Sequence, residues 1–268
     1  LMDQKSDVID IQDAPDIGII NGEVEYKDVS FSYDGRTEII KKLNLHIKPG
    51  TTNAIVGPTG AGKTTLVSLL SRFYDVDRNN GAILIDGKDI RDVSRESMIN
   101  QMASVLQEPY IFTGTVRENI KYRHEEVTEQ EMMAASQAVG CHDLIMKLPE
   151  HYNTMLDERG SNLSLGERQL ISFARALVAD PKILILDEAT ANIDSHTEQM
   201  IQKALSKLLV GRTSIIIAHR LSTIRDADKI IVLKDGEVVE EGAHQELVGK
   251  NGLYKLLHDN NLASLSGM

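Results

Sequence analysis

The sequence predicts an α/β protein with a mostly parallel sheet, an N-terminal antiparallel β subdomain and a helical subdomain. Short apolar runs, such as residues 183–186 and 214–218, have the length and composition of buried strands. Segments with apolar residues at helical spacing alternate with these runs, which favours parallel strands joined by helices. Residues 24–33 instead alternate apolar and polar side chains, as strands with one exposed face do.

The length of the chain limits the number of domains, and its net charge limits the classes of partner it can bind. The 268 residues suit one large domain or two subdomains. We expect an acidic, irregular linker over residues 1–22, a folded domain over 23–258 and a tail over 259–268. The net charge of −11 argues against broad nucleic-acid binding. No apolar run approaches the ~18 residues of a membrane helix.

The first part of the chain is expected to be rich in strands. The expected strands cover residues 24–33, 43–48, 52–56 and 82–86. Pro49 and Gly50 mark a turn after the second of them. The third runs into a glycine-rich loop, after which helical spacing predicts a helix over residues 63–73.

From about residue 95 to 180 the pattern is mostly helical, which predicts the helical subdomain. Helices are expected at 129–140, 167–180 and 195–209, strands at 182–190 and 213–220, and a hairpin at 229–242. Ser195 and Glu198 have the spacing of a capping box for the third helix. Its apolar residues Ile201, Leu205 and Leu208 share one face.

The segment Gly57–Thr64 matches the phosphate-binding pattern G-x-x-x-x-G-K-[ST], between a strand and a helix. Its glycines let several backbone N–H groups face one anion, and the following helix adds its positive end. These features predict a P-loop NTPase core; a glycine-rich turn that merely contains a lysine is the alternative. The residues expected at the nucleotide are Gly57, Pro58, Thr59, Gly60, Ala61, Gly62, Lys63, Thr64 and Thr65, with Thr64 on Mg²⁺.

Two carboxylates follow the apolar run at residues 183–186. Because parallel strands end at the ligand-binding edge of a sheet, Asp187 is expected to orient a water on Mg²⁺ or to contact the ion indirectly. Glu188 is expected to polarise or orient the attacking water. The alternative is that these carboxylates cap the next helix.

Three further residues have both functional and ordinary interpretations. Gln107 precedes a proline-containing loop, where a glutamine is commonly a surface residue. His219 ends an apolar strand, either at the ligand edge or as a solvated histidine. Tyr33 ends an early strand, where its ring could stack on adenine or simply be an edge-strand aromatic.

Together and in this order, the motifs resemble the nucleotide-binding domain of ABC transporters over about residues 22–258. The matching segments are Tyr33 (A-loop), 57–64 (Walker A), Gln107 (Q-loop), 163–169 (signature), 183–188 (Walker B), 191–194 (D-loop) and His219 (switch). The stretches 107–120, 148–154 and 154–164 resemble exporters in particular.

The resemblance implies an ATPase that drives export, with ATP and Mg²⁺ bound between two nucleotide-binding domains paired head to tail. Lys63, Glu188 and His219 would be catalytic. The metal would be contacted by Gln107 as well as by Thr64 and Asp187. Asp194 would communicate across the interface. The transmembrane domain is absent from this chain, which would act at the cytoplasmic face of the cell membrane.

The signature stretch "LSLGERQ" departs from the usual L-S-G-G-Q form. Ser164 and Glu167 predict a capping box that places Leu165 and Gly166 in the first helical turn. Ser164 and Gly166 would contact the phosphate of the partner's ATP. The bulky side chain of Leu165 lies where backbone and phosphate meet, and the charge of Glu167 opposes phosphate binding by ~0.3–1 kcal/mol. We expect a weakened anion site and favour a heterodimer, in which this chain supplies the hydrolytic Walker site, over a homodimer that tolerates the change.

Two other classes of function remain open at this point. A non-transport ATPase of the same superfamily would act on nucleic acid or ribosomes, but the acidic composition argues against it. A phosphotransferase with a phosphate loop would leave His219 and the signature stretch unexplained.

Overall fold

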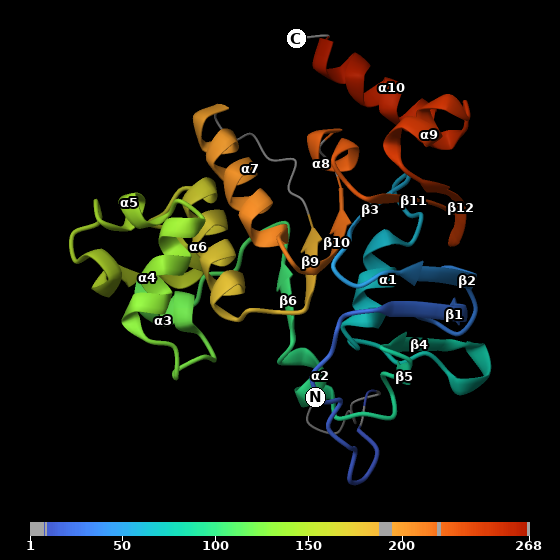
Figure 1. Ribbon diagram of the computed structural model, residues 1–268, viewed down its shortest axis with the longest axis horizontal. Coiled ribbons are helices and arrows are strands. Elements are labelled where there is room, and N and C mark those ends of the chain that lie inside the picture. The colour runs from blue at the N-terminus through green and yellow to red at the C-terminus, as the bar shows by residue number, and fades with distance from the viewer. Residues whose placement is uncertain (1–7, 9, 188–194, 219–220, 267–268) are drawn as a thin grey trace.

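The computed structural model describes residues 8, 10–187, 195–218 and 221–266. It confirms the α/β fold, with an antiparallel sheet and a mostly parallel sheet on one side and a group of helices on the other (Figure 1). Among the described helices, none is long and apolar enough to cross a membrane.

A six-stranded sheet forms the centre of the molecule, in the order β12-β11-β3-β10-β9-β6. Its strands are β3 (Thr52–Val56), β6 (Met102–Val105), β9 (Ile183–Asp187), β10 (Thr213–Ile217), β11 (Lys229–Lys234) and β12 (Glu237–Gly242). All neighbours pair in parallel except β12, which forms the predicted hairpin with β11. Strands β9 and β10 are buried almost throughout, as their continuous apolar runs predict.

The antiparallel sheet has the order β2-β1-β4-β5. Its strands are β1 (Val24–Phe31), β2 (Ile40–Ile47), β4 (Ala82–Ile85) and β5 (Lys88–Asp89). Val24, Tyr26 and Val29 are buried, and the register shifts between Tyr26 and Val29, where Asp28 has φ 49°. This irregularity explains why the apolar alternation in β1 skips one residue. A further pair, β7 (Gly114–Thr115) with β8 (Met155–Leu156), lies among the helices.

The helices form a subdomain beside the central sheet and also cover it. They are α1 (Lys63–Leu70), α2 (Arg95–Ile99), α3 (Val116–Lys121), α4 (Glu129–Ala138), α5 (His142–Ile145), α6 (Leu165–Val178), α7 (Ser195–Leu209), α8 (Leu221–Arg225), α9 (His244–Gly249) and α10 (Leu253–Ser266). Helices α3 to α6 gather at one side of the molecule (Figure 1). The helical subdomain begins later than predicted, because residues 102–105 form β6 of the central sheet.

Helix α7 has the predicted bounds, and the predicted face is buried, with Ile201, Leu205 and Leu208 each at most 5% exposed. The side chain of Ser195 lies outside the described residues, so its capping box stays a prediction. At the other end, the expected boundary at residue 258 falls inside α10, which continues to Ser266.

The second half of the predicted linker is packed on the domain. Ile17 and Ile20 are buried in the same apolar cluster as the antiparallel sheet. Asp10 forms an ion pair of 2.7 Å with Arg72, which follows α1. Residues 10–22 therefore pack on the folded domain through the buried side chains of Ile17 and Ile20 and through the ion pair of Asp10 with Arg72 after α1.

Candidate nucleotide site

The central sheet brings the predicted motifs to one edge. Strands β3, β10, β9 and β6 are neighbours and parallel, so their carboxyl ends lie together. Ile217 pairs with both Ile55 and Asp187, which sets the ends of β3, β10 and β9 at one level. Gly57 follows β3 directly, and Gln107 follows β6 after one residue. This edge is where ligands bind in open α/β sheets.

The phosphate loop has the backbone that its glycines predict. Gly57, Gly60 and Gly62 have φ of 153°, 81° and 99°, values that favour glycine. A Cβ on Gly57 would collide with the carbonyl oxygen of Leu233 in β11. A Cβ on Gly60 would meet no heavy atom within 4 Å, so the loop is open on that side. The phosphate loop therefore packs against β11 at Gly57 and is open to a ligand at Gly60.

Lys63 begins α1 and folds back over the loop. Its Nζ donates to the carbonyl oxygens of Gly57 at 2.8 Å and Pro58 at 3.0 Å. Burial lowers the pKa of Lys63, and the negative charge of Asp187 opposes that change. The ammonium group is therefore set above the loop and within the field of the Asp187 carboxylate. Thr64, next in the helix, is exposed, as a metal ligand has to be.

Tyr33 lies beside the phosphate-loop helix, just beyond the end of β1. Its hydroxyl donates to Oγ1 of Thr65 at 3.0 Å. Its ring meets Phe31 and Tyr74 edge-on, with centroids 5.0 Å away in each case. Sequence reasoning missed Tyr74, although two exposed aromatic residues directly after a helix are a signal for a binding surface.

Glu188, Asp194 and His219 lie outside the described residues. Their neighbours in the chain are described: Asp187 ends β9 and Ala218 follows β10. Gln107 is exposed and follows β6 at the same sheet edge. The structure therefore brings Tyr33, the phosphate loop, Asp187 and the Gln107 segment into one region, and the remaining three stay predictions.

The signature stretch forms the predicted capping box. Ser164 Oγ accepts from the N–H of Glu167 at 3.3 Å, and Glu167 Oε2 accepts from the N–H of Ser164 at 2.8 Å. The N–H groups of Leu165 and Gly166 have no partner within the helix, as in any first turn. Ser164 is exposed and Leu165 is half-buried. Gly166 is buried, so Ser164 and Leu165 are the parts of the N-terminal end of α6 that an anion can reach in this chain.

Gly166 has a second reason to be glycine. A Cβ there would collide with Cγ2 of Thr197 in α7, so Gly166 allows α6 and α7 to approach closely. Within the described part of the chain, no recorded hydrogen bond joins Ser164 or Gly166 to the phosphate loop.

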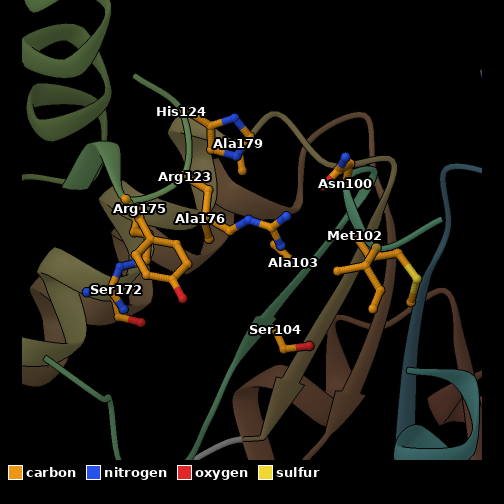
Figure 2. Close-up of a pocket in the computed structure, with 12 residues that line it drawn as sticks. Asn100, Met102, Ala103, Ser104, Arg123, His124, Ser172, Arg175, Ala176 and Ala179 are labelled. Atoms are coloured by element: carbon orange, nitrogen blue, oxygen red, sulfur yellow. The ribbon is translucent and has the colours of Figure 1, made fainter. Parts of the chain in front are cut away.

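A pocket of about 170 Å³ lies between β6 and the later turns of α6. Figure 2 shows Arg175 and Ser172 on one wall and Ser104 and Met102 on the other, with the Arg123 side chain lying between. None of its lining residues belongs to the phosphate loop. It is therefore separate from the nucleotide site.

Comparison with known proteins agrees with this geometry. The sequence model of the family described as "ABC transporter" matches residues 40–191, more than half of the chain. The chain belongs to the ABC transporter family. That match includes the phosphate loop, the signature stretch and β9, which are the elements just described.

Relatives in the ABC transporter family are similar over nearly the whole chain. An uncharacterised ABC transporter ATP-binding protein, YfiC of Bacillus subtilis, is 48% identical over 97% of this chain and 43% of its own length. An ATP-dependent lipid A-core flippase of Syntrophus aciditrophicus is 48% identical over 96% of this chain and 42% of its own length. A bacterial Atm1-family ABC exporter with ATP bound has a TM-score of 0.89 at 40% identity, covering 97% of this chain and 45% of that chain. The chain spans less than half the length of each.

Proposed function

We propose that this chain is the ATP-binding and ATP-hydrolysing domain of an ABC exporter, working at the cytoplasmic face of a membrane. The observation that carries the proposal is the convergence of the open phosphate loop, Lys63 and Asp187 at one sheet edge. The names of the relatives, which include a flippase and an ATP-bound exporter, support export. A nucleic-acid or ribosome clamp is not favoured, because these relatives are exporters and the net charge is −11.

The residues present fit a magnesium–triphosphate group. The backbone N–H groups of the loop and the ammonium of Lys63 would hold the phosphates, while the ring of Tyr33 would stack on adenine. The Thr64 hydroxyl, Asp187 and Gln107 supply the oxygen donors that Mg²⁺ prefers. The metal would supply charge neutralisation at the phosphate oxygens.

Two residues outside the described part complete the proposal. Glu188, the residue after Asp187, would accept a proton from the attacking water or orient it. His219, the residue after Ala218, would contact the terminal phosphate and help to hold that water. Lys63 would keep the phosphate in place during the step.

The partner is a second nucleotide-binding domain, paired head to tail. The donors of Leu165 and Gly166 would then face the ATP of the partner, and Asp194 would lie at the interface. We favour a heterodimer over a homodimer, because Leu165 and Glu167 weaken the anion site that this chain offers. Its own transmembrane domain, carried elsewhere in the full-length protein, would turn closure of the pair into export.

Hydrolysis by the purified protein, alone and with a candidate partner, tests this proposal. We expect slow Mg·ATP hydrolysis alone and faster hydrolysis with a partner that has an unaltered signature. The paired variant Leu165→Gly with Glu167→Gln should raise the rate of the protein alone. Fast hydrolysis alone that this variant does not change would favour the homodimer. Absence of hydrolysis in every combination would contradict the proposed function.

A further inference from the structure

Arg175 connects two segments that the nucleotide site uses. It lies in the later turns of α6, the helix that begins after Ser164. Its guanidinium donates to the carbonyl oxygen of Tyr110 at 2.8 Å and to that of Asn119 at 2.7 Å. A third bond of 2.9 Å goes to Oδ1 of Asn119. Tyr110 is three residues after Gln107, so one side chain joins the Gln107 segment to the signature helix.

Asn119 extends the connection. It is 1% exposed and accepts from the N–H of Phe112 at 2.9 Å through the same Oδ1. Its Nδ2 donates to the carbonyl oxygens of Phe112 at 2.8 Å and Thr115 at 3.1 Å. The segment from Tyr110 to Thr115 is therefore fixed at several points to α3, and through Arg175 to α6.

Two aromatic rings lie next to the guanidinium of Arg175. Arg175 Cζ is 5.2 Å from the centroid of Phe112 and 5.4 Å from that of Tyr122, and these rings stack at 4.8 Å. Among the described residues, no carboxylate forms an ion pair with Arg175. Burial lowers its pKa to about 10, so the group remains charged at neutral pH. Three oxygen acceptors and two neighbouring aromatic rings stabilise this charge.

An arginine placed in this way is an unusual choice for packing alone. Arg175 is half-buried. A partly desolvated cation without a counter-ion is unfavourable unless its hydrogen bonds are complete, and an apolar residue would fill the space at lower cost. A fork-shaped donor is needed only where several acceptors on different segments have to keep one geometry. That condition is met here, because the acceptors belong to the loop before β7 and to α3.

We propose that Arg175 is a positioning residue that makes the Gln107 segment and the N-terminal turn of α6 move as one body. The inference rests on the proposed function, since it concerns two segments that contact different ATP molecules in the pair. A shift of Gln107 at this chain's own ATP is transmitted through Tyr110 and Arg175 to Leu165 and Gly166. The two ATP sites are thereby linked through one side chain.

Hydrogen exchange in the full-length protein tests this link, with peptides that cover residues 106–115 and 164–170. In the unmodified protein, a non-hydrolysable Mg·ATP analogue should slow exchange in both segments. In Arg175→Lys, which keeps the charge and loses the fork, slowing should remain at 106–115 and disappear at 164–170. Turnover should fall about tenfold with little change in the KM for ATP, since coupling energies of ~1–3 kcal/mol are typical.

A matched control is Arg91→Lys. Arg91 is 8% exposed and bonds Asp89 and the carbonyl oxygen of Val76, neither of which belongs to the two segments. It should leave the slowed exchange in both segments unchanged. If Arg175→Lys keeps the slowed exchange in both segments, or loses it in both segments, the positioning role is wrong.

A second measurement needs no variant. In low denaturant, exchange in the unmodified protein should show 106–115 and 164–170 opening together, with equal opening free energies. Opening at clearly different free energies would overturn the inference. If the analogue slows exchange nowhere, including at residues 57–65, then the proposed function fails instead.

Discussion

The hydroxyl of Tyr33 is hydrogen-bonded to Oγ1 of Thr65 at 3.0 Å, which joins the second residue after β1 to the first turn of the phosphate-loop helix. Phe31 and Tyr74 meet the Tyr33 ring at interplanar angles of 87° and 82°. Edge-on neighbours fix the ring while leaving a face free, and the side chain is 52% exposed. This arrangement is suited to stacking on a planar base.

Replacing Tyr33 should therefore weaken nucleotide binding through the base. Tyr33→Ala should lower the affinity for ATP by about tenfold or more, because base–aromatic stacking contributes ~1–3 kcal/mol. Tyr33→Phe keeps the ring and loses only the bond to Thr65, so it should lose much less. Fluorescence titration with ATP measures both. Equal affinities for Tyr33→Ala and the unmodified protein would show that the ring does not contact adenine.

The capping box of α6 allows stability to be separated from activity. Ser164→Ala removes the side chain that accepts from the N–H of Glu167, and should lower the free energy of unfolding by ~1 kcal/mol. Ser164→Asp restores a capping oxygen but puts a negative charge where phosphate is expected. It should be nearly as stable as the unmodified protein and still hydrolyse ATP more slowly. Denaturant unfolding and turnover assays, compared across the two variants, check this; full activity in Ser164→Asp would contradict an anion site.

Glu188→Gln should bind Mg·ATP with nearly unchanged affinity and arrest turnover. The amide keeps the size of the side chain and cannot accept a proton from water. General-base contributions are about 10²–10⁴-fold, so the rate should fall within that range. Single-turnover hydrolysis separates this effect from product release. A normal rate would exclude Glu188 as the base.

The pH dependence of binding should report on Lys63. Burial places its pKa below the ordinary 10.5, and the charged form is therefore disfavoured in the folded protein until an anion arrives. Without nucleotide, this penalty on folding is present below the lowered pKa and fades as the pH rises to 10.5. With nucleotide, the triphosphate favours the ammonium, so binding takes up a proton above the lowered pKa and affinity falls as the pH rises.

Lys63→Arg is the matched control for that prediction, because arginine stays charged throughout this range. Titration calorimetry across alkaline pH, in buffers of different ionisation enthalpy, measures the proton uptake. The slope should be present with lysine and absent with arginine. Proton uptake in both proteins would assign the effect to another group.

Much of the fold could be predicted because its strongest signals are local. The unbroken apolar runs of β9 and β10, the amphipathic face of α7 and the hairpin turn at Asp235–Gly236 each depend on a few neighbouring residues. The capping box at Ser164 is similarly local and is confirmed. The start of the helical subdomain was harder to predict from the sequence, because β6 is a four-residue strand without a long apolar run.

The rest depended on contacts between distant segments. The acidic composition of residues 1–22 predicts an irregular linker, but Arg72 forms an ion pair with Asp10 and Ile17 is buried in the apolar cluster of the antiparallel sheet. Gly166 matches a phosphate-contacting position, yet only the structure shows that Thr197 also requires a glycine there. Arg175 has no motif to mark it, because two of its three acceptors are backbone oxygens and the third, Oδ1 of Asn119, lies 56 residues away along the chain.

Titration calorimetry of Mg·ATP with the unmodified protein and Lys63→Ala tests the central claim most directly. The claim is that Gly57–Thr64 and Lys63 hold the triphosphate. A hydrogen bond to a charged group contributes ~1.5–3 kcal/mol to the binding free energy, so its loss should make Mg·ATP binding about 10- to 100-fold weaker in the variant. The same affinity in both proteins would contradict the account.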